Sequence, residues 1–540
     1  MASFSLAAGD KVILLVQDRS AVGTGSPLAE LRDGLGSVGV VCECRANPDI
    51  PPTCAILSRG ETFTLPNSEI PPFTSEDGFH LISGESGVIL SANSRRGLCY
   101  AVWELMESLG WLWPTPEITL TPSQTTWEVP EGTEVYTPDL EHRIFFAEEI
   151  EITPSLVRWL SHLRFNTLFP SNPTRFSDPE RQFPEESLAI AEALGFQFIA
   201  GGDCAEWLLS HLGLESSPTW EDLPNDRTRD AANSTLELWR QMGDHFPRIS
   251  IWPGDEDSGS PVRFLDALMK AEPRMLAEFP AGMATLPAES GRTLLRILDQ
   301  PLHRTTQGPV YEEWFRDQLT RAPENDVYLF SDASTWDGRV GGAVSPLLWR
   351  RQSERMRAAI RCGVKGACLA LVRQDSHSYL ARSGASLALV ARSMWGGGGK
   401  DLEALSKRLL EAQFEQGAEL VELVCNGLED WIDGSEAPEP WNDRNSGNLR
   451  FAHQVLTKEG YRDELEHWIS GIEECPPCEP GIELAQSLAT LVALYDLEEC
   501  DDAHQSKALA RTIWSNSKIE SWPGWLRRVS PLAERLAPYL

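Results

Sequence analysis

The feature that most constrains the fold is a repeated alternation of apolar strand-like segments and helical segments between residues 140 and 400. Short apolar runs are followed by longer stretches with apolar residues at helical spacing, such as Ser155–Leu163. Parallel strands joined by helices produce this order, and eight such units predict an α/β protein with a closed (β/α)8 TIM barrel. The predicted strands are His142–Ala147, Asn166–Phe169, Phe196–Ala200, Ile249–Trp252, Met275–Phe279, Thr293–Leu298, Val327–Ser331 and Gly366–Val372.

The region before the barrel, residues 1–135, predicts a small α+β domain. A helix starting near Arg96 places Leu98, Val102 and further leucines on one face, and Gly110 ends it. We expect this helix to be the one that packs on the strands of the domain. The Pro- and Thr-rich segment Pro114–Pro138 is expected to be a linker. The strand candidates are Lys11–Asp18, Val38–Cys42 and Gly87–Ser91.

The region after the barrel, residues 401–540, follows the glycine run Gly396–Gly399 and shows only helical spacing. We expect a helical C-terminal domain that packs on the barrel or forms an interface. A chain of 540 residues is too long for one ordinary core, so three domains are consistent with its length. The expected helices are Asp401–Glu415, Ala418–Cys425, Asn448–Lys458, Asp463–Glu473, Gly481–Leu497 and Ala503–Ser515.

The net charge of the chain argues against partners that are themselves strongly negative. Eighty acidic and 47 basic residues give a formal net charge of −33, so binding to nucleic acid or to an anionic membrane surface is not expected. No basic, apolar leader and no long apolar span is visible, and we expect a cytoplasmic protein. The eleven scattered cysteines suit reduced thiols. Nothing in the sequence predicts the oligomeric state.

Acidic residues follow several of the predicted strands. Residues just past the strands of a barrel converge on one pocket, and packed carboxyl groups raise the pKa of some of them. Tryptophan and histidine side chains near the same ends could contact a sugar ring. The predicted substrate-binding residues are Glu148, Asp203, Trp252, Asp257, Asp332, Trp336, Asp375 and His377; Glu149, Trp207 and Tyr328 also lie near predicted strand ends.

The densest acidic group is Asp255-Glu256-Asp257, directly after the predicted strand Ile249–Trp252 and the turn Pro253-Gly254. Because the turn breaks strand alternation, Asp255 and Glu256 could both face the pocket. Two neighbouring carboxyl groups are what cleavage of a glycosidic bond requires. We expect Glu256 to be the general acid and Asp255 to orient or stabilise a group on the sugar. The alternative is a solvated loop that caps the next helix.

No metal or organic cofactor is expected. Cys475-Pro-Pro-Cys478 has the spacing of a dithiol, and Cys500 with His504 follows at a distance compatible with zinc. However, the pair does not lie between a strand and a helix of a βαβ unit. We therefore interpret these residues as ordinary thiols. No nucleotide-binding glycine loop, Ser-His-Asp elbow or HExxH helix is present.

Four segments carry a resemblance to known enzymes. Residues 93–114 (NSRRGLCYAVWELMESLGWLWP) resemble the segment that closes the small N-terminal domain of hexosaminidase-like and glucuronidase-like barrel enzymes. Residues 198–203 (FIAGGD), 249–255 (ISIWPGD) and 327–332 (VYLFSD) resemble glycoside hydrolase family 163. Residues 253–256 (PGDE) are similar to the Gly-Gly-Asp-Glu of family 20 hexosaminidases. The chain departs from family 163 at Asp203, where a histidine is expected, and in lacking a cysteine pair after Asp332.

The resemblance implies a glycoside hydrolase that acts on a β-linked N-acetylhexosaminide. It implies substrate-assisted retention, in which the acetamido oxygen is the nucleophile, Asp255 orients it and Glu256 is the acid. One rival is an α-glucuronidase-like enzyme, with Arg143 or Arg373 as candidates to bind the sugar carboxylate. A second is a carbohydrate-binding barrel without catalysis. The sequence leaves the sugar, its linkage, endo or exo action and retention or inversion open.

Overall fold

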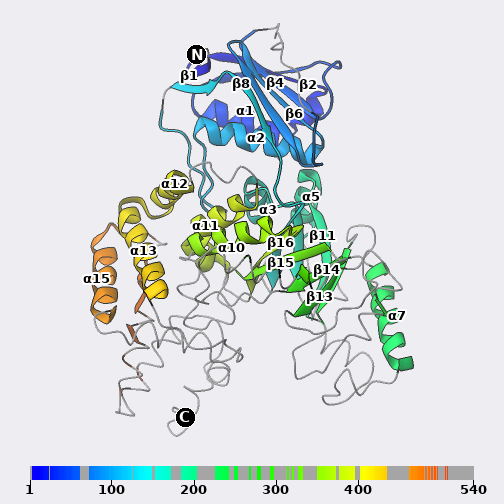
Figure 1. The fold of residues 1–540 in the computed structure, drawn as a ribbon. Helices are drawn as coiled ribbons and strands as arrows, with labels where there is room; N and C mark the ends of the chain where they lie inside the picture. The colour runs from blue at the N-terminus through cyan, green and yellow to red at the C-terminus, as the bar shows by residue number, and fades with distance from the viewer. Residues whose placement is uncertain are drawn as a thin grey trace.

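The chain forms a mixed α/β structure, shown by a computed structural model (Figure 1). The structure describes residues 3–60, 72–148, 152–171, 184–203, 225–241, 248–252, 276–280, 292–296, 326–332, 349–372, 376–395, 402–434 and 461–478, except residues 24 and 125, and a few single positions and pairs elsewhere.

Eight parallel strands pair in a closed ring in the order β10-β11-β12-β13-β14-β15-β16-β9. The ring closes where β16 pairs with β9, from Gly366 opposite His142 to Val372 opposite Glu148. All eight strands overlap the segments predicted from sequence, including the two weakest patterns, β13 and β14. The strands are β9 (His142–Glu148), β10 (Thr167–Ser171), β11 (Gln197–Asp203), β12 (Arg248–Trp252), β13 (Leu276–Pro280), β14 (Arg292–Arg296), β15 (Asp326–Asp332) and β16 (Gly366–Val372).

Helices connect several of these strands, and local sequence sets where they begin and end. Thr153 caps α3 by accepting from the backbone N–H of Leu156, and Gly195 ends α5 in the left-handed conformation with φ 81°. The apolar spacing in the sequence predicts a helix over Ser234–Phe246, but α7 starts nine residues earlier, at Asn225, because its first half is polar and gives no apolar period. The helices are α3 (Pro154–His162), α5 (Glu185–Leu194), α7 (Asn225–Gln241), α10 (Trp349–Arg361) and α11 (Ser376–Ser393).

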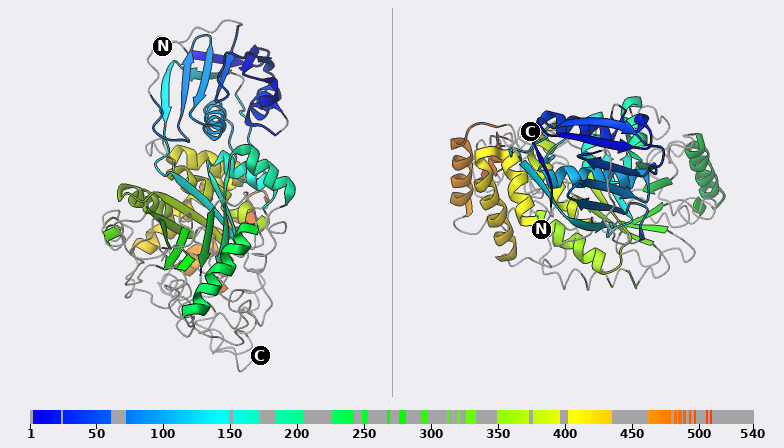
Figure 2. Two further views of the ribbon diagram at one scale, coloured as in Figure 1. Left: turned by 90° about the vertical axis from the view of Figure 1, so that its right-hand side faces the viewer. Right: turned by 90° about the horizontal axis from the view of Figure 1, so that it is seen from above.

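Residues 3–136, here called the N-terminal module, form a six-stranded sheet in the order β3-β2-β4-β6-β5-β8 and a two-stranded sheet of β1 and β7. The helices α1 (Pro27–Ser37) and α2 (Arg95–Leu109) lie between the larger sheet and the barrel (Figures 1 and 2). The strands are β1 (Ser3–Ala7), β2 (Lys11–Val16), β3 (Val41–Ala46), β4 (Cys54–Ser58), β5 (Phe79–Gly84), β6 (Gly87–Ala92), β7 (Thr126–Pro130) and β8 (Gly132–Tyr136), with a short 3-10 helix η1 (Arg19–Val22).

Three predictions for this module were wrong. The segment Pro114–Pro138 is not only a linker, because β7 and β8 lie within it and pair with β1 and β5. The module has a second packed helix, α1, whose Leu28, Leu31 and Leu35 are buried. The strand expected at Val38–Cys42 begins three residues later as β3, because the preceding Gly39 has φ 86° and forms the turn after α1.

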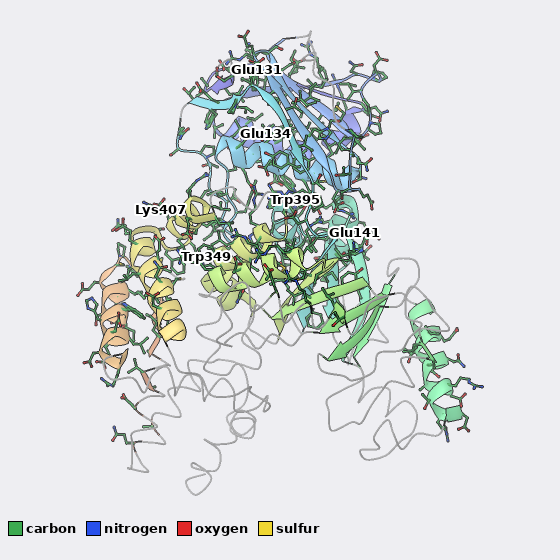
Figure 3. The ribbon with its side chains drawn as sticks, in the orientation of Figure 1. Glu131, Glu134, Glu141, Trp349, Trp395 and Lys407 are labelled. Carbon is green, nitrogen blue, oxygen red and sulfur yellow. The ribbon has the colours of Figure 1, made fainter. Side chains whose placement is uncertain are left out.

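The N-terminal module contacts the barrel at the ends where the strands begin. Asp77, in the turn before β5, accepts hydrogen bonds from Arg96 of α2 and Arg143 of β9. Arg96 also donates to the carbonyl of Gly195, just before β11, at 2.8 Å. Trp395, which follows α11, lies between the module and the barrel with the guanidinium of Arg143 4.7 Å from its ring (Figure 3). The strands therefore run away from the module, and their carboxyl ends lie at the opposite side.

The helices α12 (Leu402–Phe414), α13 (Ala418–Gly434) and α15 (Tyr461–Glu474), with the 3-10 turn η9 (Glu415–Gly417), follow the barrel in the chain. They lie beside the barrel, on the side away from α7 (Figures 1 and 2). They confirm three of the six predicted helices. Predicted helices 448–458 and 503–515 lie outside the described residues, apart from single positions, and 481–497 is described only in part.

Candidate functional site at the carboxyl rim of the barrel

The last residues of the barrel strands form one rim. Pairing places Glu148 opposite both Ser171 and Val372, Asp203 opposite Trp252, and Pro280 opposite Arg296. Because the strands are parallel, these ends meet at the same edge of the ring, where barrel enzymes bind substrates. The rim positions in ring order are Glu148, Ser171, Asp203, Trp252, Pro280, Arg296, Asp332 and Val372.

The buried residues form two separate clusters, which distinguish strand residues that face the barrel interior from those that face the surrounding helices. Ile144 and Phe146 of β9, Phe169 of β10, Ile199 of β11, Tyr328 of β15 and Cys368 of β16 form a small cluster of their own. Their strand neighbours, such as Phe145 and Leu329, belong to the large cluster that includes the surrounding helices. The small cluster is therefore the barrel interior, and Tyr328 is a core residue of mid-strand rather than a rim residue.

Strand alternation then assigns the rim positions to a face. Position 148 has the same parity as the interior residues Ile144 and Phe146, position 203 matches Ile199, and position 332 matches Tyr328. Paired residues of neighbouring strands share a face, so position 252 opposite Asp203 also belongs to the interior set. Position 326 matches Tyr328 and is paired with Arg292 of β14, so positions 292 and 296 of β14 also belong to the interior set. The three acidic positions come from β9, β11 and β15, which alternate around the ring.

The predicted site residues divide into three groups. The backbone of Glu148, Asp203, Trp252 and Asp332 ends its strand at the rim, and the three acidic residues are thus the last residues of their strands rather than residues past the strand ends. His377 is the second residue of α11, which begins shortly after β16. Eight other residues named from the sequence lie outside the described part of the chain: Glu149, Trp207, Asp255, Glu256, Asp257, Trp336, Asp375 and the rival candidate Arg373.

Sequence reasoning missed two positions of interior parity near this rim. Arg296 ends β14 at the rim, and Glu278 of β13, opposite Leu294, lies two residues before the end of its strand. The strand was predicted to run to Leu298, which placed Arg296 mid-strand and hid it. The alternation of Arg292, Leu294 and Arg296 against the partner strand is the signal that would have found it.

Arg143, the other candidate for binding a sugar carboxylate, is at the wrong end of the barrel. It lies at the start of β9 and is 1% exposed. Its guanidinium donates to Asp77 and, at 2.7 and 2.6 Å, to the carbonyls of Arg164 and Leu140. Burial acts to raise the pKa of Asp77, but the charges of Arg143 and Arg96 outweigh it and hold that pKa below its usual range. This group holds the N-terminal module on the barrel and is remote from the rim.

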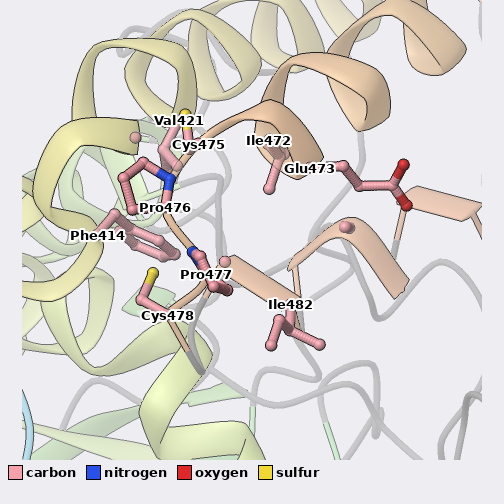
Figure 4. Close-up of a pocket in the computed structure, with 12 residues that line it drawn as sticks. Phe414, Val421, Ile472, Glu473, Cys475, Pro476, Pro477, Cys478 and Ile482 are labelled. Atoms are coloured by element: carbon pink, nitrogen blue, oxygen red, sulfur yellow. The ribbon is translucent and has the colours of Figure 1, made fainter.

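The Cys475–Cys478 pair lines a cavity of about 170 Å³ in the helical region (Figure 4). The cavity is mostly apolar, with Phe414, Val421 and Ile472 in its wall. The Cys475 thiol donates to the carbonyl of Gly471 at 3.4 Å. Across the described residues, no group of three or more His, Cys, Asp or Glu side chains could hold a metal ion. Cys500 and His504 lie outside them.

The chain was compared with known proteins at three levels. No protein-family model matches it, and no curated protein matches it. Among solved structures it is similar to a family 89 glycoside hydrolase from Clostridium perfringens in complex with 2-acetamido-1,2-dideoxynojirmycin, with 10% identity and a TM-score of 0.46 over 92% of this chain and 65% of that one. A variant of the Clostridium perfringens enzyme with its substrate GlcNAc-alpha-1,4-galactose gives 8% identity and a TM-score of 0.44, over 81% of this chain and 60% of the other.

A pyruvate carboxylase from Rhizobium etli gives 11% identity and a TM-score of 0.28 over 70% of this chain and 36% of that one. The chain thus spans less than two thirds of the length of each of these three proteins. Because all three TM-scores are below 0.5, the barrel is inferred from the strand pairing of this chain and not from its similarity to these structures. No helix in the described residues is long and apolar enough to cross a membrane.

Proposed function

We propose that the protein is a glycoside hydrolase that cleaves an N-acetylhexosaminide at the carboxyl rim of the barrel. The observation that supports this proposal is which residues stand at the rim in positions that belong to the interior of the barrel. Glu148, Asp203 and Asp332 end alternate strands at interior positions, and Trp252 is paired with Asp203. Carboxylates accept hydrogen bonds from sugar hydroxyls, and an indole offers a flat apolar surface to a pyranose ring.

The catalytic pair in this proposal is Asp255 and Glu256. They follow Trp252 by three and four residues, so the chain that leaves the rim at β12 carries them. Glu256 would donate its proton to the glycosidic oxygen as the bond to the anomeric carbon breaks. Asp255 would hold the acetamido N–H so that the carbonyl oxygen attacks that carbon from the other face. Water then opens the cyclic intermediate, and Glu256 takes the proton from the water.

The linkage proposed from the sequence is β, with substrate-assisted retention. The resemblance to family 163 is part of the same proposal, as is a division into three domains at residues 1–135, 140–400 and 401–540. An α-glucuronidase-like activity has less support, because Arg143 donates to Asp77 at the other end of the barrel and lies away from the rim. Arg296 is the described cationic position at the rim that would serve such a substrate.

Hydrolysis of aryl glycosides tests the proposal. The panel holds β-GlcNAc, α-GlcNAc, β-GalNAc and α-GlcA, assayed with wild type, Glu256→Gln and Glu131→Gln. Glu131 is an exposed carboxylate in the turn between β7 and β8, on the part of the sheet far from the barrel (Figure 3). Turnover of a 2-acetamido sugar that falls by about a hundredfold or more in Glu256→Gln, and is unchanged in Glu131→Gln, supports the assignment.

Three results would contradict it. Turnover that Glu256→Gln leaves unchanged would move the acid to Glu148, Asp203 or Asp332. Turnover of α-GlcA alone would replace the proposed substrate by a uronic acid. A chitooligosaccharide substrate extends the panel to endo action, and binding of it without turnover would show a carbohydrate-binding barrel.

A further inference from the structure

A pair of thiols lies on the edge of the N-terminal sheet, far from the rim. Cys42 and Cys44 are separated by one residue on β3, so strand alternation places both on one face. That face is the one covered by the helices, because Cys42 pairs with the buried Val12 and Cys44 with the buried Leu14. The two thiols are hydrogen-bonded to each other.

The pair lies beside the side chains of Arg32 and Asp33 of α1. Burial is the largest effect on both thiols and raises the pKa of each, that of Cys42 to about 12, whereas the Arg32 side chain, which hydrogen-bonds the Cys44 sulfur, acts to lower the pKa of both. Asp33 is ion-paired with the same guanidinium at 2.7 Å. Arg32 and Asp33 together therefore carry no net charge beside the two sulfurs.

The pair is also open to solvent. The strand β3 is the outer strand of the sheet, and both thiols are half-buried rather than enclosed. Val41, next to Cys42, is 55% exposed. Cys54 on β4 is the contrasting case, because it is also half-buried but no second thiol acts on it.

We propose that Cys42 and Cys44 form a two-sulfur binding site for a soft, thiophilic cation of the Cu(I) type. Soft sulfur ligands select such ions, and Cu(I) accepts two of them. Binding breaks two S–H bonds and forms two S–Cu bonds, and two protons pass to solvent. No electron is transferred. The absence of a third ligand group among the described side chains sets the site apart from a structural zinc centre, which takes four.

Labelling of the full-length wild-type protein tests the site without any substitution. Trypsin separates the peptide of residues 33–45, which holds Cys42 and Cys44, from that of residues 46–59, which holds Cys54. Cu(I) is supplied without oxygen from a bicinchoninate complex, and iodoacetamide is then added. With the free ion at about ten times its Kd, we expect about tenfold slower labelling of Cys42 and Cys44, and no change at Cys54.

Substitution provides the second readout. Cys42→Ser and Cys44→Ser should each lose one bound Cu(I) relative to wild type in competition with bicinchoninate, whereas Cys54→Ser should not. Far-UV circular dichroism confirms that the variants are folded. The proposal is overturned if Cu(I) leaves the labelling of the 33–45 peptide unchanged, or if both variants keep the wild-type stoichiometry. Protection confined to Cys475 and Cys478 would also overturn it and assign the ion to the helical region.

Discussion

The carboxylate of Asp77 accepts a hydrogen bond from Nη2 of Arg143 at 2.5 Å, and this contact ties the N-terminal module to the first barrel strand. Both side chains are almost fully buried, with exposed fractions of 3% and 1%. Asn166, just before β10, donates to the same carboxylate oxygen at 3.0 Å. Asp77 therefore joins the sheet, the helix α2 and two barrel strands at one point.

Replacing Asp77 by asparagine should destabilise the whole protein. The substitution leaves the buried guanidiniums of Arg143 and Arg96 without their buried counter-charge, which costs about 3–5 kcal/mol; Arg96 keeps only the exposed Glu76, at 3.9 Å. The control is Glu354→Gln on α10, whose pair with Arg361 at 2.8 Å is partly exposed and contributes about 1 kcal/mol or less. Urea unfolding of both variants checks this. If both variants lose the same free energy of unfolding, the buried Asp77 pair stabilises the protein no more than the exposed pair does.

The same carboxylate predicts an acid-dependent stability. Its pKa in the folded protein is held below its ordinary value, against the opposing effect of burial. A depressed folded pKa gives stability that is complete above the unfolded pKa of about 3.9 and is lost as the pH falls through the folded pKa. The Tm difference between wild type and Asp77→Asn should therefore narrow as the pH is lowered from 5 toward 2. A difference that is constant or widens across this range would contradict the role of Asp77.

Close packing at Gly384 of α11 predicts an unusual effect of alanine. A Cβ there would lie 2.4 Å from the carbonyl oxygen of Pro114 and 2.8 Å from Cγ2 of Thr115. Gly384→Ala should thus lower the free energy of unfolding by about 1–3 kcal/mol, although alanine favours helix. Gly36 of α1 is the matched control, because a Cβ there meets nothing within 4 Å.

Gly36→Ala should raise the free energy of unfolding by about 0.5–1 kcal/mol, the usual gain of alanine over glycine in a helix. Thermal or urea unfolding of the two variants side by side separates packing from helix propensity. A gain in stability for Gly384→Ala as well would mean that α11 does not pack against Pro114 and Thr115 as closely as the structure shows.

Local signals explain which elements the sequence predicts well. The sequence predicts a helix over Glu185–Leu194 and a strand over Gly366–Val372, and α5 and β16 have these bounds. Gly195 ends the helix in a left-handed turn, and Gly366–Val372 is a continuous apolar run. The strands β7 and β8 were missed because proline and threonine residues around them suggested a linker. Their partners β1 and β5 are more than 40 residues away, and no local pattern reports such pairing.

The site shows the same division between local and non-local information. The sequence predicts that Glu148, Asp203 and Asp332 follow strands, because apolar runs stop before them. It does not show that their strands alternate around a closed ring, since this depends on pairing across 184 residues from Glu148 to Asp332. Which strand positions face the interior is likewise known only from the closed barrel, through the cluster of residues inside it. Without it, Arg143 is a candidate for binding the substrate and Arg296 is overlooked, although Arg296 lies at the rim and Arg143 at the opposite end of the barrel.

The rim acids give the last prediction. Asp203→Asn and Asp332→Asn should each lower kcat/KM for the 2-acetamido substrate by about 10–150-fold, because one charged hydrogen bond of about 1.5–3 kcal/mol is lost. If these residues bind sugar hydroxyls, the loss lies mainly in KM, whereas in Glu256→Gln it lies in kcat. Steady-state kinetics with Glu131→Gln as control separates the two, and unfolding curves should match wild type. If kcat/KM stays at the wild-type value in both rim variants, these residues do not contact the substrate, and the binding site must be sought away from the carboxyl rim.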